Sequence, residues 1–240
     1  MSALLQSAKE NVSFLLVCLL VFVAIYAVAL LIERKCLHSV KDVGKTRKIT
    51  FIALFAALAA ALMFIEIPLF FAPSFYELDF SEIPVMICTF FLGPVAGVTC
   101  ELAKVVLKIF LKGTTTAFVG DFANFVVGCS FVVPASIIYH VNKSKKSAIW
   151  GMAIGTICMT IFGSLFNAFY LLPKFSVLFG LPMDAIIAMG NAINGSVNGV
   201  YSLVLFCVVP FNLLKGILVS VITWFLYKRV EKLLLGIIKA

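Results

Sequence analysis

Long uncharged runs of apolar residues restrict the fold of this chain more than any other feature of its sequence. Val12–Ile32 is the clearest case, with 21 residues and no charged side chain. A helix of about 20 apolar residues crosses the hydrocarbon core of a bilayer. Apolar residues form 63% of the 240-residue chain and charged residues 12%, against about 45–50% and about 25% in soluble domains. The sequence therefore predicts an all-α integral membrane protein.

The apolar runs predict seven transmembrane helices, of which the third is short for a full crossing. Gly93-Pro94 separates this short helix from the next, because this pair breaks a helix. The first helix is predicted to be retained, since it is too long for a signal peptide and the charged residues 33–35 follow it. The predicted helices are Val12–Ile32, Ile49–Ile67, Ile83–Leu92, Val95–Leu111, Phe118–Val141, Ala148–Leu172 and roughly Leu203–Tyr227.

The distribution of basic residues predicts the orientation in the membrane. If the seven helices alternate, 13 of the 19 Lys and Arg fall on one side, in loops 33–48 and 142–147 and in the C-terminal tail. Loop 68–82 on the opposite side contains acids and no basic residue. Lys and Arg are enriched in cytoplasmic loops. We therefore expect the N-terminus and loops 68–82, 112–117 and 173–202 outside, and the C-terminus in the cytoplasm.

The two larger outer loops differ in composition. Loop 68–82 mixes aromatic residues, two prolines and acids, which favours a structured loop. Segment 180–199 favours a helical turn followed by a flexible stretch rich in Gly and Asn. Such a segment can be a mobile lid or an ordinary surface connection.

The motifs of common enzyme and metal sites are missing from the sequence. Gly44-Lys45-Thr46 resembles the end of a phosphate-binding loop, but Ser39 stands where that motif requires glycine. The seven cysteines contain no C-x-x-C pair and only two histidines occur, so neither a disulfide framework nor a metal cage is expected. The basic residues do not form the basic face of a nucleic-acid binder. We therefore expect no enzyme. The chain has no nucleotide site of its own, so any active transport would take its energy from a partner or an ion gradient.

Polar side chains inside the predicted helices are candidates for function, because ionisable groups cost about 2.5–3.5 kcal/mol each in the bilayer. With the predicted orientation, these groups share one level in the outer half of the membrane. This predicts a pocket open to the outside, with an apolar wall and a few amide and ammonium groups. The groups are Glu101, Lys104 and Lys108, then Asp121 and Asn124, then Asn167, and finally Asn212 and Lys215.

Structural roles are alternatives for several of these groups. Lys108 can extend to the membrane interface, and Glu101 with Lys104 can form an ion pair, since they share one helix face. Asn167 can hydrogen-bond a neighbouring helix. Lys215 requires a partner, and the sequence places the acids of that depth on other helices.

A stripe of small residues marks the predicted helix Ile49–Ile67. Ala53, Ala57 and Ala61 repeat every four residues. Small residues at this spacing allow another helix to approach closely. The stripe therefore indicates a docking face for a partner protein, with packing inside this chain as the alternative.

Five segments, which follow one another in the family's order along the sequence, carry a family resemblance. They are LDFSEIP (Leu78–Pro84), GPVAG (Gly93–Gly97), ELAK (Glu101–Lys104), GDFANF (Gly120–Phe125) and PFNLLKG (Pro210–Gly216). Together they resemble the riboflavin-specific S components of energy-coupling factor (ECF) transporters. The resemblance implies a six-helix S-component core in residues 49–230, an extra N-terminal transmembrane helix with a basic loop in 1–48, and a cytoplasmic tail in 231–240.

The resemblance also implies a ligand and its contacts. Riboflavin would be the transported ligand, held near the outer face, with no cofactor or metal. Leu78, Asp79 and Phe80 would form the wall and lid of the site. Asn167, Asn212 and Lys215 would be its polar ligands. Glu101, Lys104 and Asn124 complete the predicted substrate-binding set.

The resemblance further implies partners in the plasma membrane of a prokaryote. Ala53, Ala57 and Ala61 would dock on a transmembrane coupling subunit, and two ATPase subunits would drive transport. Asp121 stands near a position where the family often has an amide, so its role is open. An S component for FMN or another vitamin, and a non-transporting membrane scaffold, are the alternatives.

Overall fold

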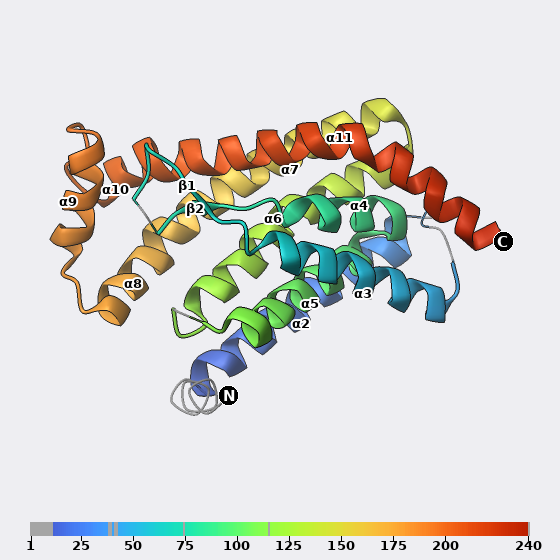
Figure 1. The fold of residues 1–240 in the computed structure, drawn as a ribbon, viewed down its shortest axis with the longest axis horizontal. Coiled ribbons are helices and arrows are strands. Elements are labelled where there is room, and N and C mark those ends of the chain that lie inside the picture. Colours follow the sequence, from blue (N-terminus) through green and yellow to red (C-terminus); the bar gives the residue numbers. More distant parts are fainter. Residues whose placement is uncertain (1–11, 38–39, 41–42, 74, 115, 240) are drawn as a thin grey trace.

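Helices packed side by side make up almost all of the computed structural model, with one short hairpin at one end (Figure 1). The structure describes residues 12–37, 40, 43–73, 75–114 and 116–239. The helices are α2 (Val12–Cys36), α3 (Lys45–Leu62), α4 (Glu82–Leu92), α5 (Pro94–Lys112), α6 (Val119–Val141), α7 (Lys145–Phe166), α8 (Leu172–Phe179), α9 (Met183–Ile193), α10 (Val200–Leu203) and α11 (Val209–Lys239). Strands β1 (Ile67–Pro68) and β2 (Glu77–Leu78) and the π-helical turns η1 (Asn167–Leu171) and η2 (Val204–Val208) complete it.

Four helical stretches of the described chain are long and apolar enough to cross a membrane. They are Val12–Cys36, Val119–Val141, Lys145–Leu178 and Val200–Leu234. Helices α3 and α5 have the length but carry more charges, and α4 has 11 residues, all of them buried. The count of seven crossings therefore stays a prediction.

Two helices are longer than predicted, and each contains a π-helical turn. The predicted end at Leu172 is wrong, because η1 leads directly from α7 into α8. The last helix begins three residues before its predicted start, and it continues to Lys239, so most of the predicted tail is helical. Pro173 and Pro210 each stand two residues after a π turn. Proline cannot donate the usual helical hydrogen bond, and a π turn accommodates such a local break.

Helix α4 forms the centre of the largest core cluster, surrounded by residues of α3, α6, α7 and α11. Helices α6 and α7 approach each other closely at two glycines. A Cβ atom on Gly151 or Gly155 would lie 2.6 Å from the carbonyl oxygen of Ala135 or Phe131, respectively. Small residues at helix contacts are the usual packing device in membranes.

The segment between α3 and α4 is ordered, as its composition predicts. Ile67 pairs with Leu78, and Pro68 with Glu77, in a two-stranded antiparallel hairpin. The hairpin lies at the same end of the bundle as α8, α9 and α10, and the C-terminus lies at the opposite end (Figure 1). The predicted helical turn in segment 180–199 is α9. The hairpin therefore lies over the end of the bundle that contains the predicted pocket.

Candidate substrate pocket

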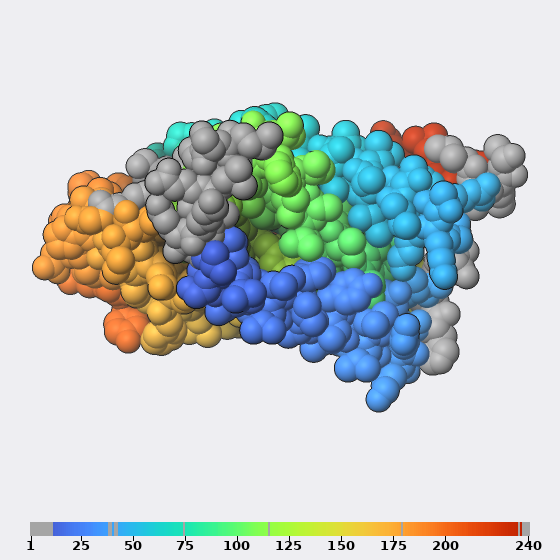
Figure 2. Space-filling view, turned by 90° about the horizontal axis from the view of Figure 1, so that it is seen from below, coloured from blue at the N-terminus to red at the C-terminus, as the bar shows by residue number. Residues whose placement is uncertain are grey.

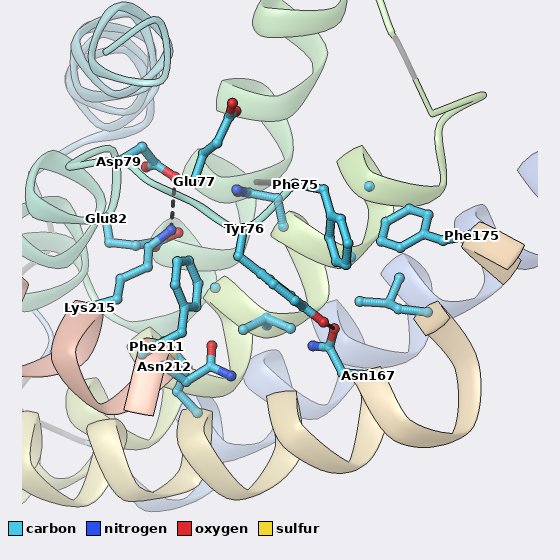
Figure 3. Close-up of a pocket in the computed structure, with 17 residues that line it drawn as sticks. Phe75, Tyr76, Glu77, Asp79, Glu82, Asn167, Phe175, Phe211, Asn212 and Lys215 are labelled. Atoms are coloured by element: carbon cyan, nitrogen blue, oxygen red, sulfur yellow. Dashed lines mark hydrogen bonds and ion pairs between the residues drawn. The ribbon is translucent and has the colours of Figure 1, made fainter. Parts of the chain in front are cut away.

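A cavity of about 160 Å³ lies between the hairpin segment and the helices at this end of the bundle (Figure 3). Its wall is mostly apolar and aromatic, with three asparagines and one lysine. This composition is typical of small-molecule sites, which combine apolar walls with a few placed polar groups. The lining residues are Phe75, Tyr76, Glu77, Asp79, Glu82, Gly120, Ala123, Asn124, Val127, Gly128, Met159, Asn167, Leu171, Phe175, Phe211, Asn212 and Lys215.

Lys215 and Asp79 form an ion pair at one end of the cavity. Lys215 Nζ donates to Asp79 Oδ2 at 2.9 Å, and both side chains are largely buried. The backbone N–H of Ser81 donates to the other oxygen of Asp79 at 2.9 Å. Burial raises the pKa of Asp79, but Lys215 and Lys104 more than offset this and hold it at about 2. The predicted partner of Lys215 is therefore found on the hairpin segment instead of on a helix.

Three asparagines place amide groups in the cavity wall. Asn167 donates from Nδ2 to the carbonyl oxygen of Gly163 at 2.8 Å, and Asn212 donates in the same way to Val208 at 3.1 Å. The Oδ1 atom of Asn124 is buried without a hydrogen-bond partner in the described part of the chain. Such atoms are rare in folded proteins. All three predicted asparagines thus line the cavity, and Asn124 offers a ligand a free acceptor atom, its Oδ1.

Tyr76 fills part of the space between these groups. Its hydroxyl donates to Asn167 Oδ1 at 2.7 Å, as the dashed line in Figure 3 shows. Its ring also contacts that of Phe211, with centroids 5.5 Å apart. Sites for drug-sized ligands enclose about 300–1,000 Å³. The cavity is smaller than this, so a ligand of that size requires the wall, of which Tyr76 is part, to move.

A second cluster of charges lies behind the cavity. Lys104 Nζ is 2.6 Å from Glu101 Oε2 and 2.8 Å from Glu82 Oε1, and the Lys104 side chain is completely buried. The Glu101 carboxylate packs against Gly128, where a Cβ would lie 2.8 Å from it. The backbone of Gly128 thus stands between Glu101 and the cavity. The structure supports the alternative of an ion pair for Glu101 and Lys104, which do not reach the cavity.

Of the three predicted lid residues, only one lines the cavity. Asp79 lines the cavity, whereas Leu78 points into a separate apolar cluster and Phe80 packs between two clusters. Alternation along the extended segment explains this, since successive side chains point to opposite faces. Phe75 and Tyr76 also line the cavity and were not predicted, although both belong to the aromatic loop 68–82.

Lys108 is paired within the protein, and its extension to the membrane interface stays an alternative. Its Nζ lies 2.6 Å from Asp121 Oδ1 on α6, which gives Asp121 a partner. Both residues line a neighbouring cavity of about 190 Å³ at the mouth of the first, together with Glu66 and Glu77. Burial raises the pKa of Glu77, and the carboxylate of Glu66 raises it further. Lys112 pairs with Glu66 at the same mouth.

The alanine stripe of α3 points away from the rest of the chain. Ala53, Ala57 and Ala61 are exposed, whereas Ala56 and Ala60 are buried against the core. Within the described residues, the stripe is therefore not used for packing.

A cavity with three amides and one lysine, in a bundle with four helices of membrane-crossing length, defines a membrane-embedded solute-binding protein. Residues 47–227 match the family described as "ECF transporter, substrate-specific component". The match covers more than half of the chain, and the chain belongs to this family. It is therefore a component of a transporter and not an enzyme.

Similar proteins agree with this assignment. The "Riboflavin transporter RibU" of Staphylococcus aureus (strain TCH60) is 38% identical over 194 residues, which are 80% of this chain and 95% of that protein. The "Riboflavin transporter FmnP" of Bacillus subtilis (strain 168) is 28% identical over 179 residues, 74% of this chain and 88% of that protein. A solved structure described as "Structure and mechanism of the S component of a bacterial ECF transporter" matches with a TM-score of 0.62 at 35% identity, over 80% of this chain and 99% of that chain. The chain thus has the S-component fold.

Proposed function

We propose that this chain binds riboflavin in the cavity between the hairpin segment and α6, α7 and α11, and delivers it inward as the S component of an ECF vitamin transporter. The observation that carries the proposal is the group of buried amides facing a cavity with aromatic walls. Two relatives are named riboflavin transporters. The flat flavin ring matches aromatic walls, and its polar edge matches amide donors and acceptors.

The charge of the cavity favours riboflavin over FMN. Lys215 is the one basic residue among the lining side chains, and Asp79 already neutralises it. Glu77 and Glu82 add two further carboxyl groups to the wall. A phosphate group would meet this acidic wall without a free cation, and like charges at close range are destabilising.

We also propose that the protein crosses the cell membrane seven times, with the pocket outside and the C-terminus in the cytoplasm. The distribution of basic residues supports this orientation. The hairpin and α8–α10 share the end of the molecule opposite the C-terminus, which suits a pocket open to the outside (Figure 1).

Ligand titration tests the central proposal. The purified full chain is expected to quench flavin fluorescence with nanomolar affinity, because bound flavin stacks against aromatic side chains. FMN is expected to compete more weakly than riboflavin. A protein that leaves riboflavin fluorescence unchanged would exclude the proposal, and tighter binding of FMN would exclude the argument from charge.

The exposed alanine stripe supports docking on a transmembrane coupling subunit that works with two ATPase subunits. Ala57→Trp places a large ring in the middle of the stripe and is expected to reduce co-purification with a co-expressed coupling subunit. Flavin binding should be unchanged, because the stripe faces away from the cavity. Ile154→Trp, on the exposed face of α7, is the matched control. Equal co-purification of both variants would argue against this docking face.

A further inference from the structure

Helix α2 is the part of the chain that the family match leaves unexplained. It ends at Cys36, before the matched residues 47–227 begin. In Figure 2 it lies as a dark blue rod along the surface, across the green helices and towards the yellow-orange end of the bundle. Contacts to α5 and α6 hold it there. The helix is therefore part of the folded bundle, and its position suggests a role.

The inner end of α2 is fixed by Glu33. Its Oε2 atom accepts a hydrogen bond from the backbone N–H of Val95 at 3.0 Å. This N–H belongs to the first turn of α5, where backbone donors have no partner inside the helix. Glu33 also pairs with Lys48 of α3 at 3.5 Å. Gly93 leaves room for this contact, because a Cβ there would lie 2.8 Å from the same oxygen.

The outer end of α2 reaches the wall of the cavity. Phe14 meets Phe122 edge to face, with ring centroids 5.7 Å apart. It also packs against a buried cluster that contains Ala123, Leu171 and Phe175. These three residues line the cavity. A single layer of side chains thus separates Phe14 from the space for the ligand.

Between its two ends, α2 covers Asp121, the acidic partner in the Lys108–Asp121 ion pair. Phe22 and its neighbours on α2 close an apolar hollow of about 260 Å³ against α5 and α6, and Asp121 lies in its lining. Charged groups exposed to lipid are costly. The helix therefore shields both the wall cluster and the carboxylate of Asp121.

We propose that α2 is the outer layer of the pocket wall and that Phe14 is a positioning residue that slows release of the ligand. The inference rests on the proposed function for the identity of the ligand. Release requires space around Tyr76 and the wall cluster, and α2 resists outward movement of that cluster. The helix therefore lengthens the residence time of the ligand without touching it.

The test compares Phe14→Ala and Leu20→Ala in the full chain. Leu20 lies on the same helix and is 69% exposed, so it is the matched control. Release of radiolabelled riboflavin, chased with excess unlabelled vitamin, is expected to be about two- to tenfold faster in Phe14→Ala, the range of one aromatic contact. Association should change less, and Phe14→Leu should restore much of the slow release. Equal release rates of Phe14→Ala and Leu20→Ala would overturn the inference.

A second measurement needs no ligand. Hydrogen–deuterium exchange over 167–179 is expected to be faster in Phe14→Ala than in Leu20→Ala, because the wall cluster loses its support. Equal exchange would also overturn the inference. If the wild-type chain fails to bind riboflavin, the proposed function fails, while the exchange experiment still decides the role of α2. If Phe14→Ala does not fold, Glu33→Gln loosens the same helix from its inner end and is tested in the same two ways.

Discussion

Two buried lysines of this protein, Lys104 and Lys215, show how similar sequence patterns can serve different purposes. Each lies three residues after a polar residue on the same helix, and each forms a short ion pair. Lys104 has two carboxylate partners, Glu82 and Glu101, and is fully sealed. Lys215 has one carboxylate partner, on the hairpin segment, and faces the cavity.

The two lysines differ in whether a ligand in the cavity can contact them. The partners of Lys104 lie on helices packed against each other, so the charges hold α4 and α5 together. The partner of Lys215 belongs to the hairpin segment, which forms one wall of the cavity. An ion pair between a helix and such a segment can bind a ligand and hold the segment over it. The comparison predicts a loss of folding at the first lysine and a loss of binding at the second.

The largest expected effect is that of Lys104→Met. Removing one partner of a buried ion pair costs about 3–5 kcal/mol, because the remaining charge is left without compensation. The variant should therefore give little folded protein, or a much lower thermal unfolding temperature in detergent. Adding Glu101→Gln should restore part of the stability. A stable Lys104→Met protein that has lost only flavin affinity would show that Lys104 belongs to the binding site, as predicted from the sequence.

Lys215→Met is expected to weaken flavin binding about tenfold or more, since a hydrogen bond to a charged group contributes about 1.5–3 kcal/mol. Fluorescence titration measures this loss. The fold should tolerate the change better than Lys104→Met, because Asp79 keeps its bond from Ser81. The double variant with Asp79→Asn removes the unpaired charge and should recover stability without recovering affinity. Unchanged affinity in the single variant would remove Lys215 from the site.

Tyr76→Phe is expected to strengthen binding, by about two- to tenfold. The hydroxyl of Tyr76 holds Asn167 at 2.7 Å, and the ligand must break this bond to reach the amide. A hydrogen bond of this kind contributes about 0.5–1.5 kcal/mol, which the variant no longer has to lose. Weaker binding by Tyr76→Phe would show instead that the hydroxyl contacts the ligand directly.

The sequence predicted the elements and the level of the site better than it predicted partners. Apolar runs indicated most helix ends to within a few residues, but α7 continues through η1 into α8 beyond the predicted end at Leu172, and α11 continues past the predicted end at Tyr227 to Lys239. Asn167, Asn212 and Lys215 were identified because polar groups inside apolar helices are rare. The exclusion of Lys104 from the cavity depends on the packing of Glu101 against Gly128, which no local pattern reveals. Tyr76 was missed because an aromatic residue in a loop is common.

The smallest expected effect is that of pH on the Lys215 end of the cavity. The pKa of Asp79 is about 2 in the folded protein and 3.8 in an unperturbed carboxyl, so its pairing stabilises fully above about pH 4 and is lost as pH falls through about 2. Flavin affinity should therefore change less than about twofold between about pH 5 and 8 on account of Asp79. The pKa of Glu77 is raised, so as pH falls Glu77 takes up a proton before Asp79 does. A change in flavin affinity at acidic pH that Glu77→Gln abolishes belongs to Glu77, and one that persists in this variant would contradict a permanently charged Asp79.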